Sequence, residues 1–92
     1  LREYVATLLR QRGLPVTPAH ILITNGSQQA LNLAARALLE NGDRVAIESP
    51  TYLAALQVFD SYGAQYAPVP MDAKGMTEEG LRHALAMRPK LL

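Results

Sequence analysis

The fold of this chain is decided by residues 21–52, which read ILITNGSQQALNLAARALLENGDRVAIESPTY. A short apolar run comes first, then a turn that contains a glycine, then a helical pattern, and then a second apolar run. This order is typical of a parallel sheet whose strands are joined by helices. The polar residues after each apolar run are then expected at the carboxyl end of a strand, where open α/β sheets bind their ligands.

Helical and apolar patterns alternate along the rest of the chain. Short apolar runs predict strands at residues 21–24, 45–47 and 65–69, with a new strand starting in 89–92. Amphipathic spacing and end signals predict helices at 1–12, 27–40, from Ser49-Pro50 to about 62, and after the cap residue Thr77, with a single turn at 17–20. We therefore expect an α/β fold with three layers, in which helices flank a mainly parallel sheet.

The composition limits the possible functions. The chain has 92 residues, 49% of them hydrophobic and 18% charged, as in an ordinary folded domain. Its basic residues are scattered and the formal net charge is +1, so no nucleic acid or membrane surface is expected as a partner. Without cysteine, and with only two isolated histidines, a structural zinc site is not expected. We expect a cytoplasmic fragment of a longer protein, with residues 1–92 forming part of one domain and no internal boundary.

The turn at residues 25–28 is the first candidate binding site. Gly26 lets the backbone approach a ligand closely, and the first amides of the helix that follows point outward with the positive end of the helix dipole behind them. This arrangement binds phosphate well. The turn has neither the lysine of a Walker motif nor the glycine spacing of a dinucleotide site, so we expect a single phosphate group. Tyr52, after the next strand, could stack on a ring attached to that phosphate.

These residues carry a resemblance to a known family. The run from residue 21 to 56, followed by GAQYAPVPMDAKGMTEEGL, resembles the fold type I pyridoxal-phosphate-dependent aminotransferases, in particular the 2-aminoadipate, kynurenine and aromatic transaminases. The Gly-Ser-Gln-Gln-Ala-Leu turn and the Glu-x-Pro-Thr-Tyr loop are its most specific elements. The resemblance implies that Gly26, Ser27 and Gln28 hold the phosphate of pyridoxal 5'-phosphate and that Tyr52 stacks on its pyridine ring.

The resemblance also implies what the chain lacks. The Schiff-base lysine of the family, the aspartate at the pyridine nitrogen and the arginine for the substrate carboxylate have no counterpart here, so no catalytic residue is assigned and the fragment alone is expected to be inactive. The exposed contexts of Lys74 and Lys90 favour surface roles. A full-length member would act on an amino acid and a 2-oxo acid, in a large cofactor-binding domain of a homodimer.

Two other functions fit the same motifs. The first is the aminotransferase-like sensor domain of a GntR/MocR-type transcriptional regulator, which would carry a DNA-binding domain upstream, and the second is a lyase of the same fold. Asn32, where an acidic residue could stand, and the Ser-Pro-Thr-Tyr loop favour the enzyme slightly. Among the neighbouring residues, Asn25 could be a turn residue or a ligand, Gln29 is expected to face outward, and Glu48 could orient the adjoining loop.

Overall fold

The computed structural model describes all 92 residues, and helices and strands alternate along it as expected. In chain order the elements are α1 (Arg2–Gln11), the 3-10 turn η1 (Pro18–His20), α2 (Ser27–Leu38), β1 (Arg44–Ser49), α3 (Leu53–Ser61), β2 (Gln65–Asp72), β3 (Gly75–Met76) and α4 (Glu78–Ala86). The helix ends agree with the predicted stop and start signals to within a few residues. The Thr77 hydroxyl, for example, accepts a hydrogen bond from the Gly80 amide at 3.2 Å and caps α4 as predicted.

The sheet is mainly parallel. β1 and β2 run parallel, in a register that begins with Arg44 opposite Gln65, and the two-residue strand β3 pairs antiparallel with the end of β2. On the other edge of β1, Leu91 forms a parallel bridge with Val45 and accepts a hydrogen bond from the Ala46 amide at 2.8 Å. The strand expected in 89–92 therefore begins beside β1.

The outer edge of β2 carries two prolines. The Gln65 amide donates to Asp43 on the β1 side, and alternate residues of a parallel strand face the same neighbour. Pro68 and Pro70 therefore have their nitrogen atoms on the opposite edge, where the Pro70 carbonyl accepts from the Thr77 amide at 2.9 Å. Proline is tolerated at such an edge because no ladder hydrogen bond is lost there.

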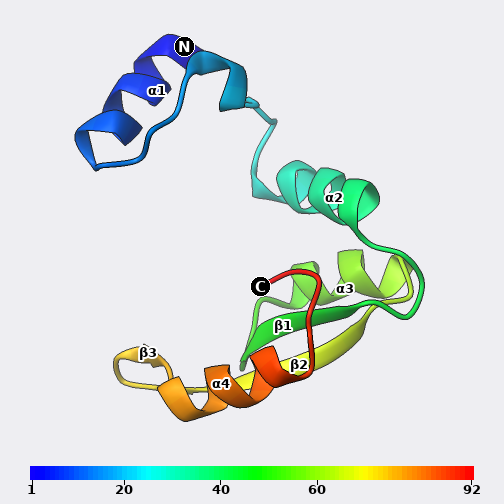
Figure 1. Ribbon diagram of the computed structural model, residues 1–92. Helices are drawn as coiled ribbons and strands as arrows, with labels where there is room; N and C mark the ends of the chain where they lie inside the picture. The colour runs from blue at the N-terminus through cyan, green and yellow to red at the C-terminus, as the bar shows by residue number, and fades with distance from the viewer.

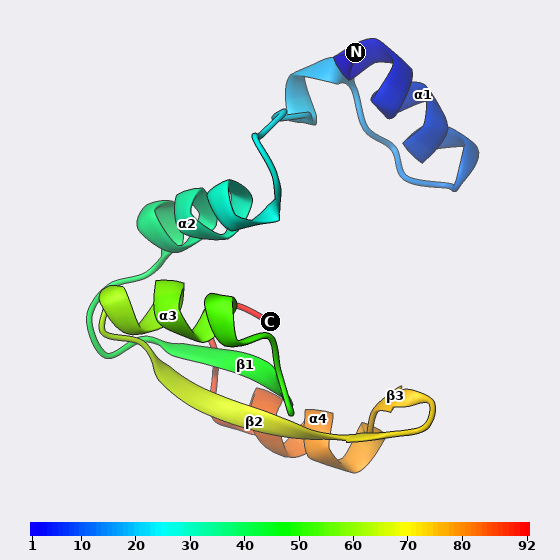
Figure 2. The same ribbon diagram turned by 180° about the vertical axis from the view of Figure 1, so that it is seen from behind.

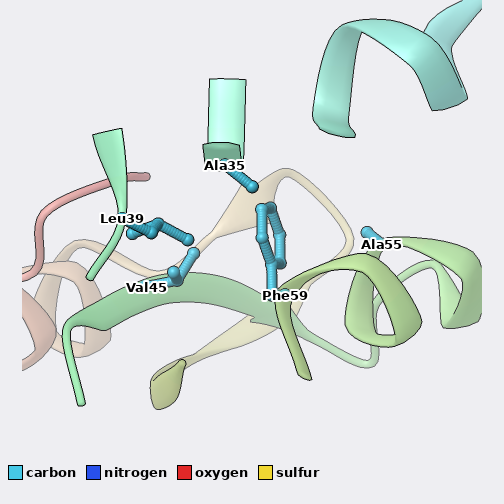
Figure 3. Packing of buried hydrophobic residues seen from close by; sticks show 5 residues of the cluster. All are labelled: Ala35, Leu39, Val45, Ala55 and Phe59. Atoms are coloured by element: carbon cyan, nitrogen blue, oxygen red, sulfur yellow. The ribbon is translucent and has the colours of Figure 1, made fainter. Parts of the chain in front are cut away.

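Helices cover both faces of the sheet, which confirms the three layers. Helices α2 and α3 lie on one side and α4 lies on the other (Figures 1 and 2). The first interface is a cluster of buried residues in which Phe59 of α3 lies against α2 and β1 (Figure 3): Ala35, Leu39, Val45, Ala55 and Phe59. The second is built from small side chains that let α4 approach the sheet: Ala46, Ala67, Val69 and Ala84.

The strand predicted at residues 21–24 is wrong. This segment is extended but belongs to no sheet, and Leu22 and Ile23 are 74% and 48% exposed. A strand requires a neighbour for its backbone hydrogen bonds. Here Leu91 bridges β1 at Val45, the outer edge of β2 carries prolines, and residues 21–24 pair with neither edge.

The N-terminal part stands apart from the sheet. Helix α1 folds back on η1, where the Arg10 guanidinium donates to the Val16 carbonyl at 2.9 Å, and residues 21–24 connect this arm to α2 (Figure 1). The radius of gyration is 15.1 Å, against about 12 Å for a compact domain of this length. Only 10 of the 92 residues are buried, so most of the packing is concentrated around β1 and β2.

Candidate functional site

The N-terminus of α2 presents free backbone amides. Gly26 is the N-cap residue, with φ 94° and ψ 170°, a conformation that favours glycine, and no side chain caps the helix. The first internal bond joins the Ala30 amide to the Gly26 carbonyl at 3.3 Å, and the amides of residues 27–29 have no hydrogen-bond acceptor. These three donors, with the positive end of the helix dipole, fit the oxygen atoms of a phosphate group.

Side chains fold the turn before α2 into a fixed shape. The Thr24 hydroxyl donates to the Gly26 carbonyl at 3.1 Å. Gln29 is exposed, as expected, and its side-chain amide oxygen accepts a hydrogen bond from the Asn25 backbone amide at 2.6 Å. Asn25 thus acts as a turn residue through its backbone.

One hydrogen bond brings the two candidate loops together. The Gln28 side-chain amide donates to the Ala54 carbonyl at 3.2 Å, across 26 positions of sequence. Ala54 lies in the first turn of α3, two residues after Tyr52. The first turn of α2 therefore lies beside the first turn of α3, and the Gln28 side chain is engaged in this contact while its backbone amide has no acceptor.

Tyr52 lies at the N-cap of α3 and projects into solvent. Its side chain is 62% exposed and has no hydrogen-bond partner, so the aromatic face is available to a ligand. The expectation that Ser49-Pro50 caps and starts α3 is wrong: Ser49 ends β1, the Ser49-Pro50 peptide is cis, and the helix begins at Leu53. The N-cap of α3 is therefore Tyr52, three residues later than the expected cap at Ser49.

A cavity between α2 and β1 does not include the expected site residues. It has a volume of about 460 Å³ between α2 and β1, and its lining is mostly apolar, with Glu48 and Thr51 as the exceptions. Neither Tyr52 nor any residue of 26–28 lines it. Apolar walls offer no compensation for a buried phosphate charge, so this cavity does not fit the phosphate group of the expected ligand.

Tyr66 carries the single strongly perturbed ionisable group. Burial, a hydrogen bond to Asp60 at 2.6 Å and the negative charge of that carboxylate together raise the pKa of the Tyr66 phenol to about 12. The hydroxyl also lies 3.1 Å from the Leu56 carbonyl. These contacts join β2 to α3, and the tyrosine takes no part in the candidate site.

The predicted surface position of both lysines is confirmed. Lys74 and Lys90 are exposed, and the turn at Lys74 is closed by a hydrogen bond from its backbone amide to the Asp72 carboxylate at 2.7 Å. No helix of the chain combines the length and the apolar character that crossing a membrane requires.

Sequence reasoning missed the contacts that position the candidate residues. The Gln28–Ala54 bond and a second bond, from the Tyr62 hydroxyl to the Asn32 side-chain oxygen at 2.7 Å, both join α2 to α3. Glutamine, asparagine and tyrosine on successive helices were visible in the sequence. Which of them meet depends on how the helices cross, and no local pattern encodes that angle.

The comparisons with known proteins agree with this architecture. The family model for aminotransferase class I and II matches residues 1–92, and the chain belongs to this family. It is 41% identical over 86 residues to aromatic-amino-acid aminotransferase 1 of Thermococcus litoralis, which covers 92% of this chain and 21% of that protein. The crystal structure of kynurenine aminotransferase from Pyrococcus horikoshii, in complex with PMP, superimposes with a TM-score of 0.80 at 42% identity, over 98% of this chain and 23% of that one.

The chain is also similar to transcriptional regulators. It is 38% identical over 81 residues to an uncharacterized HTH-type transcriptional regulator, YdfD, of Bacillus subtilis, over 88% of this chain and 17% of the regulator. The chain thus spans about a fifth of the length of the curated relatives it matches.

Proposed function

We propose that this chain supplies the phosphate-binding and ring-stacking part of the cofactor site of a pyridoxal-phosphate-dependent aminotransferase. The observation that carries the proposal is the Gln28–Ala54 hydrogen bond, which places the free amides at the start of α2 beside the helix turn that Tyr52 precedes. The family match and the PMP complex of the Pyrococcus relative support pyridoxal 5'-phosphate as the cofactor.

Each residue would have a separate task. Gly26 gives the backbone the positive φ of 94° that the turn requires, and Ser27 and Gln28 would donate backbone hydrogen bonds to the phosphate, with the Ser27 hydroxyl as a further donor. Tyr52 would fix the plane of the ring by stacking. The bound cofactor supplies an electron sink for the bonds at the substrate Cα, and the protein fixes the orientation on which that chemistry depends.

The activity of the whole protein belongs to the same proposal. It would transfer an amino group from an amino acid to a 2-oxo acid, as a cytoplasmic homodimer, with residues 1–92 inside a single large cofactor-binding domain. The residues named here bind and orient the cofactor, and none of them is assigned a role in proton transfer.

A second candidate is the sensor domain of a transcriptional regulator. The similarity to YdfD favours it, and its cofactor site could use the same turn and tyrosine. The two functions differ in the full-length protein, because a regulator of this kind would bind a specific DNA duplex with nanomolar affinity and an enzyme would not.

The test uses the purified full-length protein. Bound cofactor should give a visible absorbance band that disappears when an amino acid is added and returns with a 2-oxo acid. A band that responds in this way without catalytic turnover, together with specific DNA binding, would favour the regulator. A protein that fails to bind pyridoxal phosphate at all would contradict both functions.

A further inference from the structure

Two side-chain hydrogen bonds tie α2 to α3 at separate points. At the start of both helices, the Gln28 side chain donates to the Ala54 carbonyl at 3.2 Å. One turn further along α2, the Asn32 side-chain oxygen accepts from the Tyr62 hydroxyl at 2.7 Å, at the C-terminal end of α3. Ala35 and Phe59 provide a buried contact between the same two helices.

Together these contacts fix the orientation of α2. A single apolar contact between two helices lets one helix pivot on the other, because apolar packing has little directional preference. Hydrogen bonds are directional and weaken steeply when their angle changes. The two bonds are attached one turn apart on α2 and eight residues apart on α3, so together they oppose rotation about the buried contact.

The orientation of α2 matters for the proposed cofactor site. The phosphate and the ring of the cofactor are joined covalently, whereas the amides that would hold the phosphate and the Tyr52 ring belong to different helices. Such groups must be held within about 0.5 Å of the productive geometry to bind one rigid ligand well. The contact between α2 and α3 sets this separation.

We propose that Asn32 and Tyr62 are positioning residues for the cofactor site, although neither touches the cofactor. Their hydrogen bond holds the start of α2 at the distance from Tyr52 that lets one molecule engage both. This inference rests on the proposed cofactor site. The role of Asn32 requires a side-chain oxygen at position 32 that accepts the hydrogen bond from Tyr62.

The test compares two variants with a matched control in the full-length protein. Tyr62→Phe removes the hydroxyl donor, and Asn32→Ala removes the acceptor at an exposed helical position where alanine favours the helix. Tyr66→Phe deletes a hydroxyl that bonds to α3 as well, but to Asp60 and Leu56 and not to α2. Each protein is titrated with pyridoxal phosphate, and the melting temperature of its cofactor-free form is measured.

We expect both Tyr62→Phe and Asn32→Ala to weaken cofactor binding about three- to tenfold, the effect of losing one hydrogen bond. Tyr66→Phe should leave cofactor affinity unchanged even where it lowers the melting temperature. Asn32→Asp should keep the affinity of the unmodified protein, because a carboxylate accepts a hydrogen bond from the Tyr62 hydroxyl at least as well as the asparagine oxygen does. The visible circular dichroism of the bound cofactor should change in the first two variants, since the ring loses its fixed orientation.

Other results would overturn the inference. Equal losses of affinity in Tyr62→Phe and Tyr66→Phe would mean that any loosening of α3 affects the site. Unchanged affinity in Asn32→Ala would mean that the bond has no positioning role, while the proposed cofactor site would stand. If the unmodified protein binds no pyridoxal phosphate, the proposed function fails and this inference fails with it.

Discussion

Gly80 of α4 lies so close to Pro70 of β2 that a β-carbon on residue 80 would be 2.6 Å from the proline Cδ. It would also lie 2.7 Å from the Thr77 hydroxyl oxygen and 3.3 Å from the Pro70 nitrogen. The absence of a side chain at this position lets α4 approach the sheet, and the small buried residues Ala67 of β2 and Ala84 of α4 are packed in the same interface. The close approach of α4 to β2 therefore depends on glycine, with no β-carbon, at position 80.

Gly80→Ala should destabilise the protein despite the better helix propensity of alanine. Overpacking costs about 1–3 kcal/mol, and the propensity gain of about 1 kcal/mol offsets only part of it. Thermal unfolding of the full-length protein measures the difference. Glu79→Ala, next to it on the exposed side of α4, is the control and should have little effect. An unchanged or higher melting temperature for Gly80→Ala would contradict the close packing.

Phe59→Ala should be the most damaging single change to the cluster between α2, α3 and β1. The ring is 7% exposed and is the largest side chain of that cluster, so its removal leaves a cavity that small neighbours such as Ala35 and Ala55 cannot fill. Such truncations cost about 3–5 kcal/mol. Denaturant unfolding is the measurement, and Gln57→Ala, on the exposed side of the same helix, should change stability by less than about 0.5 kcal/mol.

Stability should fall at alkaline pH through Tyr66. The pKa of this phenol is raised to about 12 in the folded protein, above the value near 10 of an unfolded chain. The contribution of the neutral phenol is therefore complete below pH 10 and is lost as the pH rises from about 10 to 12. Ultraviolet difference titration of the unmodified protein against Tyr66→Phe should show one phenol that ionises near pH 12. In Asp60→Asn the pKa of the same phenol should be lower. The substitution removes the negative charge of Asp60, and it replaces the carboxylate that accepts a hydrogen bond from the neutral phenol.

Tyr52 offers a test of the proposed stacking. Its ring is largely exposed and makes no hydrogen bond, so substitutions there should not affect folding. Tyr52→Phe keeps the aromatic face and should retain cofactor affinity, whereas Tyr52→Ala should lose at least about 0.5–1.5 kcal/mol of binding free energy. Titration with pyridoxal phosphate measures both. Equal affinities for the alanine and phenylalanine variants would exclude stacking by this residue.

Local signals in the sequence predicted the helices well. Gly63 shows why, since it follows α3 with φ 70°, and a side chain there would collide with Asn41. Glycine stops of this kind, together with caps such as Thr77, are encoded within a few residues of the helix end. The periodicity of apolar residues then identifies the buried face without any knowledge of the partner.

The sequence was a poorer guide wherever distant segments meet. The apolar run Ile21-Leu22-Ile23 looks like a strand, but whether it pairs depends on a free sheet edge and not on its own composition. The short strand β3 was missed, although the turn at residues 72–75 is typical of a hairpin. The hydrogen bonds from Gln28 and Tyr62 span 26 and 30 positions, and they depend on the crossing of two helices.

The two prolines of β2 have a consequence for how the chain avoids self-association. A bare strand edge can recruit the same strand of another copy, because its amides and carbonyls are unpaired. Pro68 and Pro70 leave that edge without donors at two alternate positions, so a second β2 could not complete a ladder there. The two prolines therefore disfavour edge-to-edge association of a newly made chain through β2.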